Sequence, residues 1–140
     1  MYDNKIYLFV HAIWSVKHGS ALLTNPIRKL MLAHIVQEAE SKGTKILVIN
    51  GVEDHVHCLL QLTSIQNVAT VLKSIKSESS HWLNENKLLA AAFEWHDGYA
   101  AYSVSPSGVK QVTDYIHKQE EHHKTKTLES ELGMFDKIQF

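Results

Sequence analysis

The sequence predicts an α+β fold, in which an antiparallel sheet carries helices on one face and a further helix is appended near the C-terminal end. Two observations support this prediction. Strand and helix patterns follow one another in the order strand, helix, strand, strand, helix, strand. The two halves of this pattern are similar in length, and no Pro- or Gly-rich linker divides them. We therefore expect residues 1–140 to form one domain.

The first half of the chain begins with a β-branched and aromatic run, KIYLFVHAIWSV over 5–16, which predicts a long, largely buried strand. Pro26, after a potential Asn25 cap, starts a helix whose apolar residues recur at helical spacing to Lys42, and Gly43 ends it. KILVIN over 45–50 and HVHCLLQL over 55–62 predict two more strands. The short GVED segment between them suggests a hairpin.

The second half begins with a helix over about 66–85. FEW over 93–95 and YAAYSV over 99–104 predict two strand pieces around an Asp-Gly turn. A polar helix then runs from Ser105 to about 123, and the pattern predicts no definite structure for the charged tail over 125–140. This order is the ferredoxin-like, or split βαβ, layout, which leaves one sheet face open for a site.

Composition is that of a globular protein, with 44% hydrophobic and 21% charged residues. A single cysteine, Cys58, excludes an internal disulfide framework and fits a reducing, cytoplasmic setting. The sequence shows neither a signal-peptide pattern nor an apolar run of membrane-spanning length, so no membrane association is expected. Lys plus Arg (14) and Asp plus Glu (15) balance, so a nucleic-acid-binding surface would have to be a local groove.

The most informative triplet is His55-Val56-His57 on the third predicted strand. Alternate side chains of a strand point the same way, so both imidazoles project from one face and Val56 from the other. Two such imidazoles can bind one divalent ion, although His-x-His pairs also occur on strands without a metal. The apolar strand and the neighbouring Glu53-Asp54 turn favour the metal, because histidines on an apolar strand need polar partners.

The last predicted helix carries Tyr115 and Gln119 four residues apart, and hence on one face. Val109, Val112 and Ile116 form an adjoining apolar stripe that should pack on the sheet. A tyrosine hydroxyl is a weak nucleophile unless a metal or base assists it, and a phosphodiester needs a cation to polarise it. Two histidines and a glutamine carbonyl would form a mixed site suited to Mg²⁺ or Mn²⁺.

Taken together, these segments resemble the single-tyrosine HUH transposases of the insertion-sequence-200-like class. The resemblance extends from about Tyr7 to Lys124 and rests on four motifs in order: HAIWSVKH, EDHVHCLL, EWHDGYAAYSVSPS and QVTDYIHKQEEHH. It implies that His55 and His57 are metal ligands, that Gln119 completes the metal site and that Tyr115 is the nucleophile.

The resemblance also implies the reaction and the partners. The protein would cleave and rejoin single-stranded DNA at the hairpin-flanked ends of a mobile element, through a 5′-phosphotyrosine intermediate and with Mg²⁺ or Mn²⁺. It would be a homodimer in which the tyrosine helix of one subunit can serve the histidines of the other, with Gly108 and the segment before it as the hinge. The absence of a Walker sequence agrees with a reaction that needs no ATP.

Several further residues have weaker assignments. Potential phosphate or DNA contacts are Lys73, Lys76, Lys110, Lys118 and His122. His11 could approach the metal from a neighbouring strand, but we interpret it as a hydrogen-bonded core histidine. Trp14 and Trp95 lie in strand patterns, and core packing is the simpler interpretation of both.

Three alternative functions remain at this point. A domesticated relative would use the same chemistry to process chromosomal palindromes, and the sequence does not separate it from a mobile-element transposase. A non-catalytic nucleic-acid-binding module on a ferredoxin-like sheet would show aromatic RNP strands, whereas the equivalent strand here carries HVHCLL. A metal or heme sensor would use the histidines but would leave Tyr115 without a role.

Overall fold

The computed structural model describes residues 4–121 and 127–136. Its sheet contains four strands in the order β2-β3-β1-β4, and every neighbouring pair is antiparallel. The strands are β1 (Leu8–Ser15), β2 (Lys45–Gly51), β3 (His55–Leu62) and β4 (Ala100–Val104). The α+β, ferredoxin-like prediction is therefore confirmed.

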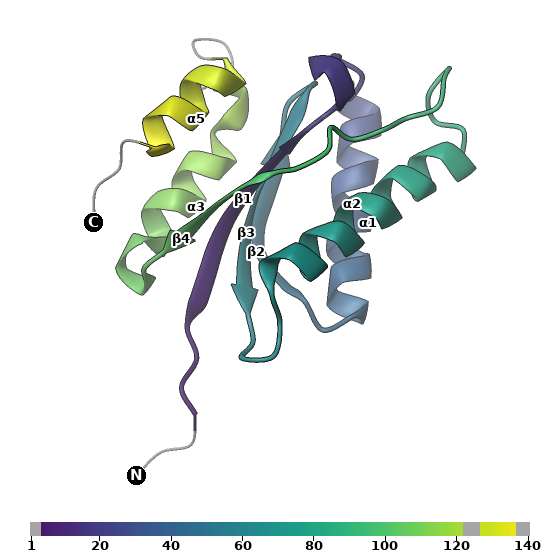
Figure 1. Cartoon of the computed structure of the whole chain (residues 1–140). Coiled ribbons are helices and arrows are strands. Elements are labelled where there is room, and N and C mark those ends of the chain that lie inside the picture. Colours follow the sequence, from purple (N-terminus) through teal and green to yellow (C-terminus); the bar gives the residue numbers. More distant parts are fainter. Residues whose placement is uncertain (1–3, 122–126, 137–140) are drawn as a thin grey trace.

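Helices lie on both faces of this sheet (Figure 1). Helices α1 (Asn25–Ser41) and α2 (Val68–Glu85) cover one face, and α3 (Val109–His117) and α5 (Leu128–Asp136) cover the other. The sheet face that was predicted to be open is thus covered by the tyrosine helix α3 and by α5, a helix of the tail. None of the helices described in 4–121 and 127–136 is long and apolar enough to cross a membrane.

The alternation of side chains along β1 and β3 produces two separate cores. Val56, Cys58 and Leu60 of β3 point toward α1 and α2, where they pack with Trp14 and Met31. On the opposite face, the smaller core consists of Phe9, Val48, Leu59 and Ile116. His55 and His57 share the face of Leu59, so the strand directs both imidazoles away from the larger core.

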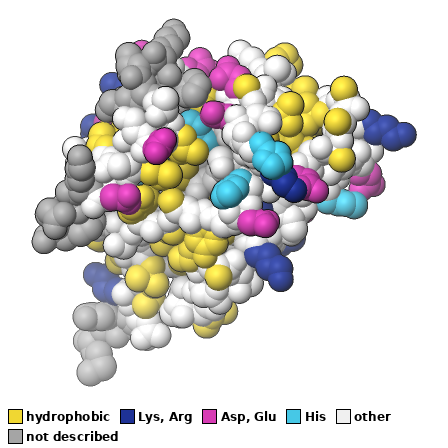
Figure 2. Space-filling model, turned by 45° about the horizontal axis from the view of Figure 1, so that its top comes forward, with side chains coloured by type: hydrophobic (Ala, Val, Ile, Leu, Met, Phe, Trp, Pro, Cys, Tyr) yellow, Lys and Arg dark blue, Asp and Glu magenta, His cyan; other side chains and the backbone are white. Residues whose placement is uncertain are grey.

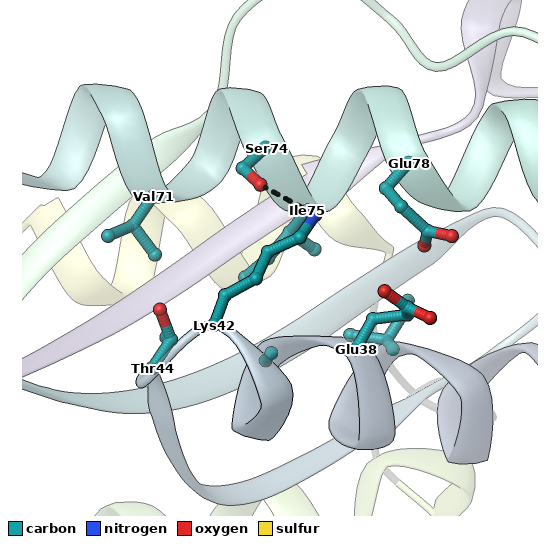
Figure 3. Close-up of a pocket in the computed structure, with 9 residues that line it drawn as sticks. Glu38, Lys42, Thr44, Val71, Ser74, Ile75 and Glu78 are labelled. Carbon is teal, nitrogen blue, oxygen red and sulfur yellow. Dashed lines mark hydrogen bonds between the residues drawn. The ribbon is translucent and has the colours of Figure 1, made fainter.

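Helices α1 and α2 pack against each other over the larger core. The close-up in Figure 3 shows Glu38 of α1 facing Glu78 of α2, and Lys42 Nζ donates a hydrogen bond to Ser74 Oγ at 3.4 Å. Asn67 caps α2, since its side-chain oxygen accepts a hydrogen bond from the backbone N–H of Thr70 at 2.9 Å. Helix α1 begins at Asn25, with Thr24 rather than Asn25 at the cap position.

The structure corrects three predicted elements. Segment 93–95 forms only an isolated bridge, between Trp95 and Val16. The tyrosine helix does not run unbroken to about 123: α3 ends at His117, and residues 119–121 resume a helical turn after Lys118. The tail contains the regular helix α5, where the sequence pattern predicted no definite structure.

Candidate metal and nucleophile site

The two histidines of β3 lie at the centre of the face that α3 and α5 cover. Both side chains are fully buried. Their position depends on the β2–β3 hairpin, where a Cβ on Gly51 would lie 2.7 Å from the carbonyl oxygen of His55. Only glycine fits this close approach, so Gly51 helps to set where β3 and its imidazoles begin.

Each imidazole uses its Nδ1 atom for a partner within the protein. His55 Nδ1 lies 2.7 Å from Oδ1 of Asp54, and His57 Nδ1 lies 2.9 Å from Nε2 of His11 on β1. A metal-binding histidine typically has such a partner on the ring nitrogen that does not face the ion. The prediction that His11 is a hydrogen-bonded, buried histidine is confirmed, and its partner is His57 itself.

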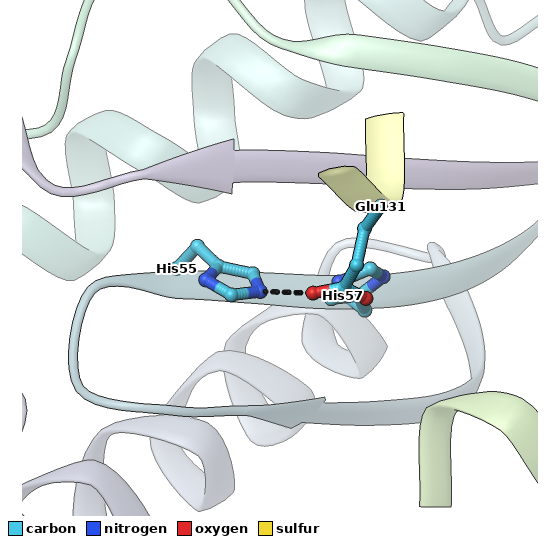
Figure 4. A group of neighbouring side chains, drawn as sticks. All are labelled: His55, His57 and Glu131. Carbon is cyan, nitrogen blue, oxygen red and sulfur yellow. Dashed lines mark hydrogen bonds and ion pairs between the residues drawn. The ribbon is translucent and has the colours of Figure 1, made fainter. Parts of the chain in front are cut away.

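The two Nε2 atoms converge on one carboxylate, that of Glu131 on α5. The distance from His55 Nε2 to Glu131 Oε1 is 3.2 Å, and that from His57 Nε2 to Oε2 is 3.3 Å. Figure 4 shows Glu131 reaching from α5 toward the β3 strand, where it meets both imidazoles. Ligand atoms of the three residues all lie within 4.8 Å of one another, which is close enough for a single ion.

Tyr115 and Gln119 reach the same carboxylate from the tyrosine helix and the turn that follows it. The Tyr115 hydroxyl and the Gln119 side-chain amide both donate hydrogen bonds to Oε2 of Glu131, the amide at 3.2 Å. Gln119 is fully buried, and its Oε1 atom has no hydrogen-bond partner among the residues that the structure describes. The structure thus brings together all four residues of the predicted site.

Packing of α3 on the sheet explains how Tyr115 arrives there. The predicted stripe of Val109, Val112 and Ile116 packs on the smaller core, with Ile116 fully buried. Asn50 of β2 fixes the end of the helix, because its side-chain amide donates to the carbonyl oxygens of Ile116 and His117 at 3.0 and 3.2 Å. These contacts hold the Tyr115 side chain, half-buried, over His57.

Burial and close charges shift the pKa values of the site. Burial alone would lower the pKa of His55, but hydrogen bonds to Asp54 and Glu131 outweigh it and raise the pKa to about 9. Burial and the proximity of His57 lower the pKa of His11 to about 3. For Tyr115, burial and the hydrogen bond to Glu131 raise the pKa above its usual value. The phenol is therefore neutral and needs help to act as a nucleophile.

Glu131, which lies in the charged tail, was not among the residues predicted from the sequence. The sequence carries only a weak indication that Glu131 is buried. Leu128, Leu132 and Phe135 recur at helical spacing, and Glu131 lies on the same side of the helix. A carboxylate on the buried side of an amphipathic helix is unusual unless it has a specific partner. Asn50, which fixes the end of α3, also left no signal in the sequence.

The predicted DNA contacts are dispersed. Lys73 and Lys76 belong to α2 and lie across the sheet from the histidines, and Lys76 donates to the carbonyl oxygens of His96 and Gly98 at 2.8 and 2.7 Å. Lys110 and Lys118 are exposed near the two ends of α3, and Lys110 pairs with Asp114. His122 lies outside the described residues. Acidic and basic side chains are interspersed on the face that Figure 2 shows.

A second group of potential ligands, His34, Glu38 and Glu78, lies between α1 and α2 on the far face of the sheet. His34 Nε2 lies 2.7 Å from Oε1 of Glu78, and its ring stacks on Trp82 with centroids 4.3 Å apart. These contacts already join the two helices. The group is only partly buried and remote from Tyr115, so we assign it to helix packing.

Comparison with known proteins identifies the family. The profile of the IS200-like transposases matches residues 4–119, which is most of the chain. The chain belongs to this family. Among curated proteins, the IS200-like transposase described here is 25% identical over 114 residues to the ISDra2 transposase TnpA of Deinococcus radiodurans, covering 78% of this chain and 81% of that one.

Solved structures show that the IS200-like transposase shares its fold with other transposases. It superposes with a TM-score of 0.67 on a proposed transposase from Deinococcus radiodurans R1, at 21% identity over 85% of this chain and 98% of that one. It also superposes on the REP-associated tyrosine transposase bound to a REP hairpin, with a TM-score of 0.64 and 18% identity over 88% and 74% of the two chains.

Proposed function

We propose that this transposase cleaves and rejoins single-stranded DNA at hairpin-flanked element ends, with Tyr115 as nucleophile and with Mg²⁺ or Mn²⁺ as cofactor. One observation carries the proposal: the Tyr115 hydroxyl and the Nε2 atoms of His55 and His57 face the same carboxylate. The proposed nucleophile and the proposed metal ligands therefore lie next to one another.

In the proposed cleavage step, the Tyr115 oxygen forms a bond to the scissile phosphorus and the bond from phosphorus to the 3′ oxygen breaks. The phenol loses its proton and the departing 3′ oxygen gains one. The products are a 5′-phosphotyrosine link and a free 3′-hydroxyl. Attack by that hydroxyl, or by one from the other element end, reverses the step and joins the strands. Each exchange replaces one phosphodiester with another, so that no ATP is consumed.

Residues His55, His57 and Gln119 would hold the metal. The donor set fits: two imidazoles have their Nδ1 atoms occupied and their Nε2 atoms convergent, and the buried Oε1 of Gln119 has no partner within the described part of the chain. Two nitrogens and an amide oxygen suit a divalent ion that also accepts phosphate oxygens. When bound, the ion would supply the positive charge that polarises the phosphodiester.

The protein's own residues would prepare the nucleophile and its surroundings. Ile116 and Asn50 hold α3 against the sheet, and this packing keeps the Tyr115 hydroxyl beside His57, with ring centroids 5.9 Å apart. The buried surroundings exclude water, which strengthens electrostatic interactions with a charged phosphate.

The proposed substrate and assembly draw on the relatives as well as on the site. A structural relative is bound to a REP hairpin, which supports a hairpin substrate here. Lys110 and Lys118 flank the tyrosine helix and could contact phosphates. We propose a cytoplasmic homodimer. Tyr115 lies beside the histidines of its own chain, so an exchange of tyrosine helices between subunits is not needed to assemble the site.

The test is covalent capture. The full chain is incubated with Mn²⁺ and single-stranded DNA carrying a hairpin, and protein–DNA adducts are resolved under denaturing conditions. We expect the wild type to form an adduct, Tyr115→Phe to form none, and Tyr99→Phe, which changes an exposed tyrosine, to behave as the wild type. An adduct with Tyr115→Phe would refute the nucleophile assignment. The absence of any wild-type adduct, over a panel of hairpins with Mg²⁺ and Mn²⁺, would favour a non-catalytic binding module.

A further inference from the structure

We propose that Glu131 is itself a ligand of the divalent ion, so that the metal site is built from two histidines and one carboxylate. The inference rests on the metal site of the proposed function and extends it. The matched family region ends at residue 119, so neither Glu131 nor the helix α5 that carries it belongs to the part of the chain by which the family is identified.

The donor atoms of Glu131, His55 and His57 lie close together. The Glu131 carboxylate presents one oxygen to each histidine, at 3.2 and 3.3 Å from the two Nε2 atoms. The Nδ1 atoms of the same imidazoles are directed to Asp54 and His11, which fixes the orientation of both rings. Two fixed imidazoles and a carboxylate form a donor set that divalent metals commonly use.

Burial makes the charge of the Glu131 carboxylate costly. Glu131 is fully buried, and a carboxylate in such a position needs a compensating positive charge close by. Within residues 4–121 and 127–136, its hydrogen-bond and ion-pair partners are His55, His57, Tyr115 and Gln119, none of which carries the permanent charge of a lysine or an arginine. A divalent ion between these groups would supply that charge in place of a protonated imidazole, and it would also give the Gln119 oxygen a partner.

Helix α5 is held on the site by contacts other than those of Glu131. Phe135 packs edge-on against Tyr115 and His11, with ring centroids 5.3 and 4.8 Å apart. The Tyr102 hydroxyl donates to Asp136 at 2.7 Å. The helix is thus held in register over β1, β4 and α3, which keeps the carboxylate at the histidines and allows its charge to be removed without displacing the helix.

The same position admits a competing role, in which the Glu131 carboxylate blocks the site. Its Oε2 atom accepts the hydrogen bond of the Tyr115 hydroxyl, where a phosphate oxygen of the substrate would be expected. The two roles differ in their effect on the metal. A ligand strengthens metal binding, whereas a blocking group leaves it unchanged and slows the reaction of Tyr115.

The experiment measures Mn²⁺ binding to the full chain by calorimetry, with the wild type and three variants. Glu131→Gln keeps the shape of the side chain and removes its charge. Glu129→Gln makes the same change on the exposed side of the same helix and serves as the control. His57→Asn removes a ligand of the proposed function. Thermal unfolding by circular dichroism checks that each variant is folded.

We expect Glu131→Gln to weaken Mn²⁺ binding by at least about 10- to 100-fold, the loss that follows removal of only a hydrogen-bond partner of a ligand. Glu129→Gln should leave the affinity unchanged, and His57→Asn should reduce it most. With Co²⁺ in place of Mn²⁺, the visible absorption of Glu131→Gln should also differ from that of the wild type. If Glu131→Gln binds Mn²⁺ as tightly as the wild type while His57→Asn loses Mn²⁺ affinity, this inference is overturned and the proposed function stands. If Glu131→Gln also forms the protein–DNA adduct faster than the wild type, the Glu131 carboxylate blocks the site. A wild type that binds no Mn²⁺ would refute the metal site of the proposed function itself.

Discussion

The Nε2 atom of His11 lies 2.9 Å from Nδ1 of His57, so a residue of β1 fixes the ring of a proposed metal ligand on β3. The two residues are diagonal neighbours in the sheet, because Ile13 is the residue directly opposite His57. With the Nε2 lone pair of His57 directed to an ion, its Nδ1 carries the proton and donates it to His11. Hydrogen bonding across two strands thus selects the tautomer that can bind a metal.

Replacing His11 should therefore weaken metal binding without unfolding the protein. We expect His11→Leu to lower the Mn²⁺ affinity by about 10- to 100-fold, the range found when the hydrogen-bond partner of a metal-binding histidine is removed. His11→Gln keeps an acceptor and should restore part of the affinity. His81→Leu, at an exposed position of α2, is the control. Equal Mn²⁺ affinity of His11→Leu and wild type in titration calorimetry would show that His11 only fills space.

The raised pKa of His55 predicts that the metal-free protein loses stability at alkaline pH. The pKa is about 9 in the folded chain and 6.5 in the reference state, so the charged imidazole stabilises the fold fully below 6.5. This contribution, at most about 3 kcal/mol, is lost as the pH rises through 9. Urea denaturation in EDTA at a series of pH values measures it. In His55→Gln, the free energy of unfolding should change less between pH 6.5 and 9 than in the wild type. A pH dependence as steep as that of the wild type would contradict the raised pKa of His55.

Lys76 is predicted to stabilise the fold rather than to bind DNA at the site. Its ammonium group donates to the carbonyl oxygens of His96 and Gly98, which ties α2 to the turn before β4. We expect Lys76→Met to lower the free energy of unfolding by about 1–2 kcal/mol. Lys73→Met, on the same helix but exposed, should change it little. Hairpin-DNA affinity, measured by fluorescence anisotropy, should be similar in both variants; a selective loss in Lys76→Met would restore the DNA-contact assignment.

The parts of the molecule that could be predicted from sequence are those governed by local periodicity. The period of two in HVHCLLQL placed both imidazoles on one face, and the helical spacing of Val109, Val112 and Ile116 placed α3 on the sheet. Both patterns reflect a single requirement, the burial of one apolar side. The gathering of His55, His57, Tyr115 and Gln119 followed from these patterns together with the family resemblance.

Features that depend on one long-range polar contact were not predictable. Glu131 contacts His55, which lies 76 residues before it in the sequence, and only the weak apolar spacing of Leu128, Leu132 and Phe135 distinguishes it from a solvated acidic residue. Segment 93–95 has the composition of a strand, yet Asn84 binds both backbone groups of Phe93, at 2.6 and 3.0 Å. These side-chain hydrogen bonds replace those of a strand partner, so only the bridge at Trp95 remains.

Helix α5 is nine residues long, which is too short to be stable by itself in water. It holds its place through Phe135 and the Tyr102–Asp136 hydrogen bond, to which Glu131 adds its contacts with the histidines. Under the Glu131 proposal, an ion that binds only when α5 is seated would add to these contacts, and the fraction of molecules with α5 seated would rise with the free concentration of the ion by mass action. The susceptibility of α5 to proteases would then fall as the free concentration of that ion in the cell rises.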